Sequence, residues 1–163
     1  MTTLTKFPKS RQAWSKCEDI FAEYLSTYPG LISLERAPKK GFPDWDIKIT
    51  YEKDGKIKEA SYEIKSDRKS EYSGNFCLEY YNIKKGWPSG ICTSKADYYV
   101  YFAWGKRWIA RRDELLVKLI SECHWDIRDW GNDNSRMLIK PMTEIENYFS
   151  EVPNLDKKPF EED

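Results

Sequence analysis

The apolar positions along the chain predict one helix near its start and several short strands after it. Trp14, Cys17, Phe21 and Leu25 recur at spacings of three and four residues, which lays an apolar stripe on one face of a helix over about 10–28. Alternating or continuous apolar runs typical of strands follow at 31–35, 45–51, 57–65, 75–82, 97–103, 107–111 and 137–140. Two more helices are predicted at 112–123 and 143–149, with one helical turn at 93–96.

The connections between these segments indicate a single α/β domain. Asp54-Gly55 joins the strands 45–51 and 57–65, and this pair tolerates the positive φ of a tight hairpin turn. The stretches 66–74 and 86–90 are predicted to be loops, and Trp87 in the second is expected to pack, with stacking on a base as the alternative. No repeat or linker divides the chain. We expect one domain over 1–152, with a mixed central β-sheet flanked by helices, and a frayed tail over 153–163.

The overall composition says little about function, but the distribution of charge along the chain is uneven. The 163 residues carry 27 basic and 27 acidic side chains, and 15% are aromatic, which argues against a disordered chain. Residues 142–163 hold seven acidic residues and two lysines, a net charge of −5, so the rest carries +5 and a nucleic-acid partner stays open. With no apolar run of 18 residues and no signal-like N-terminus, we expect no membrane partner and a cytoplasmic protein.

One hairpin carries the candidate chemistry. Glu63 and Lys65 are two residues apart on a strand, so they project from one face, while Tyr62 and Ile64 point into the core. Antiparallel pairing across Asp54-Gly55 brings Asp46 roughly opposite Glu63. Two such carboxylates repel unless a cation joins them, and oxygen ligands favour Mg²⁺ or Mn²⁺. The alternative is a salt-bridged, solvated sheet face.

These residues and their surroundings resemble a known family. Pro43-Asp44, followed some twenty residues later by Glu63-Ile64-Lys65, is similar to the PD-(D/E)XK nuclease superfamily, in particular its small resolvase-like and phage-encoded members. The resemblance extends over about two-thirds of the chain. It includes Glu18 at the start of the helical segment 18–25, the "GN…E" strand at 74–79 and the "SGI…T-x-x-AD" stretch at 89–97. It implies a restriction-endonuclease-like core and a bacterial or phage-infected cell as the setting.

The resemblance also implies residue roles. Asp46 and Glu63 would bind Mg²⁺ or Mn²⁺ together with the backbone carbonyl of Ile64, and Lys65 would position the attacking water or stabilise phosphate charge. Glu18 would complete the outer shell, with a surface glutamate or Glu23 as alternatives. Asp44 matches the family's Pro-Asp literally, but Asp46 precedes an aliphatic residue as in resolvase-like members, so we rank Asp46 first. Glu79, at a strand centre, is a possible additional carboxylate or the partner of a lysine.

Basic and polar residues flank the proposed site and are expected to contact DNA phosphates. The basic set is Arg36, Lys39, Lys40, Arg68, Lys69, Lys84 and Lys85. The polar set, Ser89, Thr93, Ser94 and Lys95, lies at a predicted helix start and is either a phosphate site or an ordinary capping turn.

The sequence therefore predicts a Mg²⁺-dependent endonuclease that hydrolyses DNA by direct attack of water. A homodimer is expected if both strands are cut, because each chain carries one site. The alternative is a catalytically inactive DNA-binding or structural domain that keeps the fold.

Overall fold

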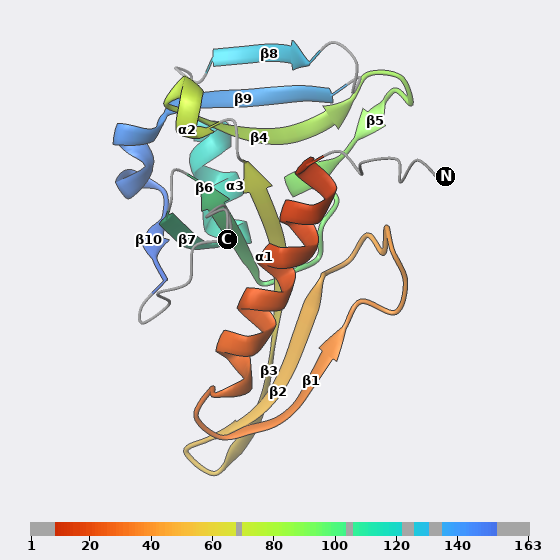
Figure 1. The fold of residues 1–163 in the computed structure, drawn as a ribbon, viewed down its shortest axis with the longest axis vertical. Coiled ribbons are helices and arrows are strands. Elements are labelled where there is room, and N and C mark those ends of the chain that lie inside the picture. The colour runs from red at the N-terminus through yellow and green to blue at the C-terminus, as the bar shows by residue number, and fades with distance from the viewer. Residues whose placement is uncertain (1–8, 68–69, 104–105, 122–125, 131–134, 153–163) are drawn as a thin grey trace, which may run out of the picture.

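The computed structural model describes residues 9–67, 70–103, 106–121, 126–130 and 135–152, which form two β-sheets and the helices packed on them (Figure 1). The larger sheet has six strands in the order β1-β2-β3-β6-β7-β10. They are β1 (Leu31–Arg36), β2 (Ile47–Lys53), β3 (Lys56–Asp67), β6 (Tyr98–Ala103), β7 (Lys106–Arg111) and β10 (Ser150–Glu151). Only β3 and β6 run parallel, so the sheet is mixed, as the sequence predicted.

A second sheet corrects the expectation of one central sheet. Its four antiparallel strands have the order β5-β4-β9-β8. They are β5 (Trp87–Pro88), β4 (Asn75–Asn82), β9 (Ser135–Pro141) and β8 (Asp126–Trp130). The predicted strands β4 and β9 pair with each other here, whereas β5, β8 and β10 were not predicted at all. Strands of two to five residues bury too few side chains to leave a period-2 pattern in the sequence.

The helices differ from the expectation in length and type. Helix α1 (Lys9–Ser26) and helix α3 (Arg112–Ser121) lie where they were predicted. The predicted loop 66–74 contains the short helix α2 (Ser70–Ser73), and the predicted helix 143–149 is instead the 3₁₀ helix η2 (Met142–Asn147). The single helical turn falls at η1 (Gly90–Cys92) rather than at 93–96. Among the described helices, none is long and apolar enough to cross a lipid bilayer.

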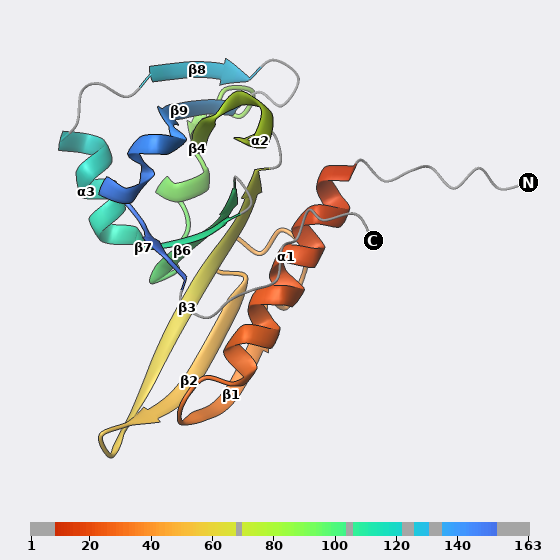
Figure 2. The ribbon, with the colours of Figure 1, turned by 60° about the vertical axis from the view of Figure 1, so that its left-hand side comes forward.

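Two hydrophobic cores lie on opposite faces of the larger sheet (Figures 1 and 2). On one face, α1 packs its apolar stripe against β2, β3 and β6, with Phe21 and Ile49 almost fully buried. On the other, β6 and β7 pack against the second sheet, η1, α3 and η2, with Tyr99 and Phe76 at the centre. Strand β6 contributes side chains to both cores, and Glu63 of the neighbouring strand β3 is buried beside it.

The β2–β3 hairpin confirms the predicted pairing. Its register runs from Lys53↔Lys56 at the turn to Ile47↔Tyr62, and Asp54 and Gly55 both have positive φ. Beyond Tyr62, β3 loses β2 as a neighbour and continues to Asp67 beside β6 alone. One edge of β3 is therefore open over its last five residues, and the candidate site lies there.

Candidate active site

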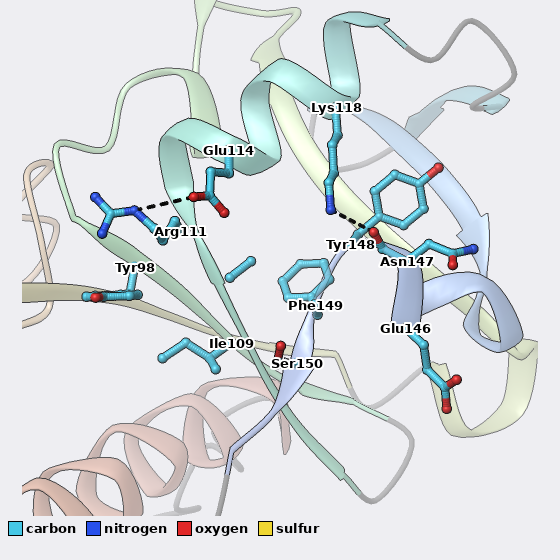
Figure 3. Close-up of a pocket in the computed structure, with 11 residues that line it drawn as sticks. Tyr98, Ile109, Arg111, Glu114, Lys118, Glu146, Asn147, Tyr148, Phe149 and Ser150 are labelled. Atoms are coloured by element: carbon cyan, nitrogen blue, oxygen red, sulfur yellow. Dashed lines mark hydrogen bonds and ion pairs between the residues drawn. The ribbon is translucent and has the colours of Figure 1, made fainter.

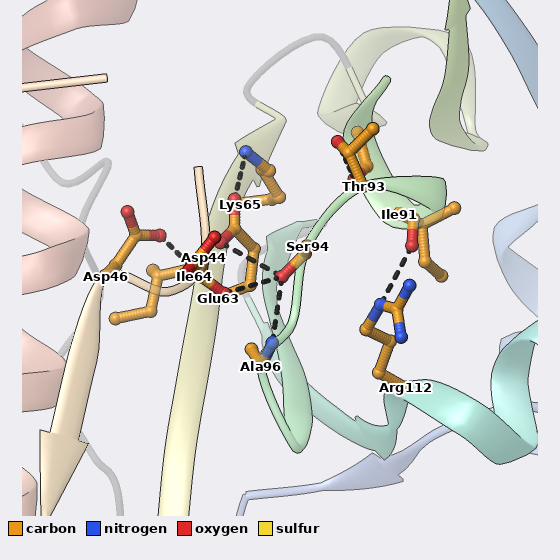
Figure 4. A network of polar contacts seen from close by, with 11 residues as sticks. Asp44, Asp46, Glu63, Ile64, Lys65, Ile91, Thr93, Ser94, Ala96 and Arg112 are labelled. Carbon is orange, nitrogen blue, oxygen red and sulfur yellow. Dashed lines mark hydrogen bonds and ion pairs between the residues drawn. The ribbon is translucent and has the colours of Figure 1, made fainter. Parts of the chain in front are cut away.

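Asp46 lies at the open edge of β3, directly before β2 begins. Its backbone N–H donates to the carbonyl of Tyr62 (2.9 Å), and its Oδ2 accepts the N–H of Ile64 (2.7 Å). The carboxylate therefore occupies the position where another residue of β2 would have continued the ladder. Pro43 has no N–H to donate, which is consistent with the strand starting only after it. Asp46 is thus fixed beside the backbone of Ile64 (Figure 4).

Glu63 and Lys65 share the face of β3 opposite α1, as predicted. Glu63 is buried, and its Oε1 lies 2.7 Å from Nζ of Lys65. Tyr62 and Ile64 point to the other face, into the core beneath α1. The Glu63 side chain is 10% exposed and that of Lys65 is 40% exposed, so water screens this pair less than a pair on an open surface.

Burial and neighbouring charges shift the pKa values of the ionisable groups at this edge. Burial and the nearby Glu63 carboxylate raise the pKa of Asp46 to about 6, although the Ile64 N–H and Lys65 oppose the shift. Burial lowers the pKa of Lys65, but Tyr99 and Glu63 more than offset this and raise it above its ordinary value. Asp46 thus holds its negative charge at a cost, whereas Lys65 stays an ammonium.

These side chains open into a cavity of about 820 Å³. It brings together Glu18 from α1, Asp46 at the start of β2, the three consecutive residues of β3, and Glu79 from the second sheet. The lining residues from the predicted site are Glu18, Asp46, Glu63, Ile64, Lys65 and Glu79. Glu18 also pairs with Arg36 (3.4 Å), and Glu79 accepts a hydrogen bond from the hydroxyl of Ser135.

Asp44 is held differently from Asp46. Its carboxylate lies 3.8 Å from Nζ of the exposed Lys95, and its carbonyl accepts the Lys95 N–H (2.9 Å). It does not line the cavity. The structure thus separates the two aspartates that the sequence left as rivals.

The predicted phosphate-binding residues are spread over three places. Arg36, Lys39 and Lys40 form one rim of the cavity, although Arg36 pairs with Asp19 (3.1 Å) as well as with Glu18. Lys84 and Lys85 lie in the turn between β4 and β5, outside the cavity lining. Arg68, Lys69 and the tail 153–163 lie outside the described residues.

The polar cluster after Pro88 does not lie at the start of an α-helix, as the sequence had suggested. It surrounds η1, a 3₁₀ turn of three residues whose preceding Ser89 makes no side-chain cap, and so it lacks the aligned N–H groups of a long helix. Thr93 lines the cavity, but its hydroxyl donates to Gly90 of its own turn (3.2 Å). Phosphate contact by Ser89 and Lys95 remains a prediction without a helix to support it.

Ser94 has a more central place than the sequence suggested. It is buried, and its hydroxyl lies 3.4 Å from Oε2 of Glu63 and 3.3 Å from the carbonyl of Asp44. The Ala96 N–H donates to it (3.2 Å). Ser94 thus links the carboxylate of Glu63 to the loop that precedes Asp46.

Tyr99 was missed by sequence reasoning. It pairs with Glu63 in the parallel β3–β6 register and is almost fully buried. Burial raises the pKa of its phenol, and the charges of Lys65 and Glu63 act on it too. A tyrosine in an apolar, aromatic strand looks like core, so only the register of β6 against β3 identifies it.

Another cavity, of about 310 Å³, is lined by residues of β6, β7 and α3 and by the segment 146–150 (Figure 3). Its charged residues include Arg111, Glu114 and Lys118. They belong to exposed pairs: Arg111 lies 3.9 Å from Glu114, and Lys118 donates to the carbonyl of Asn147 (2.7 Å).

No family profile matches the chain. A search of curated proteins finds no significant match. Within the described ranges, no three Asp, Glu, His or Cys side chains form a preassembled metal-binding group.

Proposed function

We propose that this chain is a metal-dependent endonuclease that hydrolyses phosphodiester bonds in DNA, with a restriction-endonuclease-like core. The observation that carries the proposal is the meeting of Asp46, Glu63 and Lys65 in one cavity, where burial and the Glu63 carboxylate raise the pKa of Asp46. Perturbed carboxylates beside a cation in a cleft are typical of functional sites.

The donor set fits a hard divalent cation. Asp46 and Glu63 supply carboxylate oxygens, and the Ile64 carbonyl is the proposed third ligand; such oxygens suit Mg²⁺ or Mn²⁺. A bound cation would relieve the repulsion that raises the pKa of Asp46. When bound, it would supply Lewis-acid polarisation and a lowered pKa of water.

The chain's own residues would then bind and orient the phosphate. Lys65 keeps its proton, because its pKa lies above the ordinary value, so it serves as a fixed positive charge and donor rather than as a base. Ser94 restrains Glu63, and Glu18 limits the space on the side of α1. Lys39 and Lys40 at the rim would hold the DNA backbone without reading its sequence.

One observation favours the alternative, a DNA-binding domain that does not cut. Both carboxylate oxygens of Glu63 already have partners, Oε1 with Lys65 and Oε2 with Ser94. A structural ion pair would have the same contacts.

A cleavage and binding assay separates the two. We would incubate the protein with labelled single-stranded, duplex and branched DNA in Mg²⁺, in Mn²⁺ and in EDTA, beside an Asp46→Asn preparation to reveal contaminating nucleases. Metal-dependent products from the wild type alone support the proposal. Binding without products supports the inactive domain. If calorimetry also detects no Mg²⁺ or Mn²⁺ binding, the metal-dependent nuclease is overturned.

A further inference from the structure

The turn between β4 and β5 presents an aromatic side chain to solvent. Trp87 is 56% exposed, which contradicts the expectation that it packs. Nζ of Lys85 lies 5.8 Å from the centre of the Trp87 ring, and Lys84 beside it is exposed. Neither lysine has a carboxylate partner within the described part of the chain. We call residues 83–87 the tryptophan tip.

Two hydrogen bonds to Asn82 and a left-handed glycine define the conformation of the tip. The Gly86 N–H donates to the carbonyl of Asn82 (2.9 Å), and the Lys85 N–H donates to Oδ1 of Asn82 (2.9 Å). Gly86 has a φ of +72°, which a side chain would strain. Trp87 precedes Pro88, which restricts its backbone to the extended region. Such a preformed turn loses little entropy when it contacts a ligand.

The base of the same hairpin forms a wall of the candidate active site. Glu79 and Gly90 line the 820 Å³ cavity, and a Cβ on Gly90 would lie 2.2 Å from the Glu79 carbonyl, so the two segments touch. Trp87 is three residues from Gly90, or about 10 Å along an extended strand. At a rise of about 3.4 Å per stacked nucleotide, this distance corresponds to about three nucleotides.

We infer that the tryptophan tip stacks Trp87 on an unpaired base, within about three nucleotides of the phosphate in the cavity. This inference rests on the proposed function in taking DNA as the partner, and it adds a preference for unpaired nucleotides. Aromatic side chains stack on any base face, and paired bases inside a duplex do not offer that face. Lys84 and Lys85 supply charge for the adjacent phosphates. A protein partner would not require the charges of Lys84 and Lys85. The test below distinguishes it from DNA.

The test measures binding without cleavage, so it does not depend on nuclease activity. Fluorescence anisotropy in EDTA would compare a single-stranded oligonucleotide, its blunt duplex, and the duplex with a short unpaired flap. The variants are Trp87→Ala, Trp87→Phe and the double variant Lys84→Gln/Lys85→Gln. Tyr72→Ala is the matched control, because Tyr72 is an 81% exposed aromatic before β4, at the opposite end of that strand from Trp87.

We expect Trp87→Ala to weaken single-strand and flap binding by about ten- to hundredfold, with duplex binding nearly unchanged. Trp87→Phe should keep most of the affinity, and Tyr72→Ala all of it. The lysine variant should reduce the salt dependence by about 1.4 in log–log slope, whereas Trp87→Ala should leave that slope unchanged.

Several results overturn the inference. One is Trp87→Ala binding within about twofold of wild type, and another is an equal loss on blunt duplex, which would assign Trp87 no role with unpaired bases. No DNA binding by the wild type also overturns it and favours a protein partner. Binding that depends on Trp87 without any metal-dependent cleavage keeps this inference and removes the nuclease.

Discussion

Two of the cavities on the larger sheet are lined by carboxylates and cations, yet they treat those charges differently (Figures 3 and 4). Arg111 and Glu114 lie 3.9 Å apart, and their side chains are 50% and 69% exposed. At Asp46 and Glu63, two carboxylates share one cavity, and the Glu63 side chain is only 10% exposed.

The difference between the cavities is desolvation, not composition. Exposed opposite charges neutralise each other and gain little from the contact. Burial, together with the like charge of Glu63, raises the pKa of Asp46. A mixed cluster of Asp, Glu and Lys therefore indicates a candidate functional site only where the fold buries it. The predictions below test whether the two cavities differ in this way.

The largest effect is expected at Lys65, with Lys118 of the other cavity as its control. Lys65→Ala should lower metal-dependent cleavage by about 100- to 1,000-fold, because it removes the fixed charge beside the phosphate. DNA affinity should change little, since rim lysines dominate backbone binding. Lys118→Ala, in the other cavity, should leave the cleavage rate unchanged. Single-turnover rates and anisotropy check both, and equal rates in wild type and Lys65→Ala would remove Lys65 from the mechanism.

The second effect separates the two aspartates. Asp46→Asn should lose about 100-fold in cleavage, if one metal ligand contributes ~3 kcal/mol of transition-state stabilisation. Asp44→Asn should cost much less, because Asp44 is directed to Lys95 and does not line the cavity. Mn²⁺ calorimetry and cleavage rates measure the difference. Equal losses would mean that both aspartates share the site, and a loss at Asp44 alone would mean the ranking is wrong.

The same substitution should stabilise the protein without metal. The folded pKa of Asp46 is about 6, above the ordinary 3.8, so the folded state binds more protons between about pH 4 and 6. The wild type thus loses stability as pH rises through that window. At pH 7, Asp46→Asn should be more stable by up to about 3 kcal/mol, because the amide carries no charge and its oxygen can still accept the Ile64 N–H. Urea unfolding in EDTA at pH 4 and pH 7 tests this, and an equal difference at both values would contradict it.

A smaller effect is expected at Ser94. Ser94→Ala removes the hydroxyl beside Glu63 and should lower Mn²⁺ affinity and cleavage by about tenfold, with a loss of about 1 kcal/mol in stability. Ser61→Ala is the matched control: Ser61 is buried on the same face of β3, and its hydroxyl donates to Asp97 (3.2 Å). It should lose similar stability and keep metal affinity. Equal metal affinities in the two variants would make Ser94 merely structural.

Local patterns explain why the hairpin was predictable from sequence. Asp54-Gly55 set the turn, and period-2 alternation set the faces of β2 and β3, so Asp46 and Glu63 met as expected. The second sheet was not predictable, because its central strands β4 and β9 are far apart in the sequence and its outer strands β5 and β8 are short. The same limit hid Tyr99, whose position depends on a crossover to the parallel strand β6.

For Trp87 the prediction from residue type was wrong, because the side chain was expected to be buried and is exposed. Large aromatics are buried on average, so packing was the expected outcome, but burial is decided by what covers the β4–β5 turn. Likewise, residues 143–149 have a helical pattern of apolar positions, yet they form a 3₁₀ turn between β9 and β10. Tertiary connections override a weak local preference in segments this short.

The smallest effect is expected at Glu114, in the cavity whose charged side chains are exposed. Glu114→Gln removes the carboxylate that lies 3.9 Å from Arg111, but Asp113 remains 3.5 Å from the same guanidinium. All three side chains are at least half exposed, so we expect a stability change within about 0.5 kcal/mol and little difference between pH 4 and 7. Urea unfolding of Glu114→Gln and Asp46→Asn under the same conditions compares the changes in unfolding free energy for the two cavities. A pH-dependent change at Glu114 as large as that at Asp46 would show that exposure does not separate the two cavities.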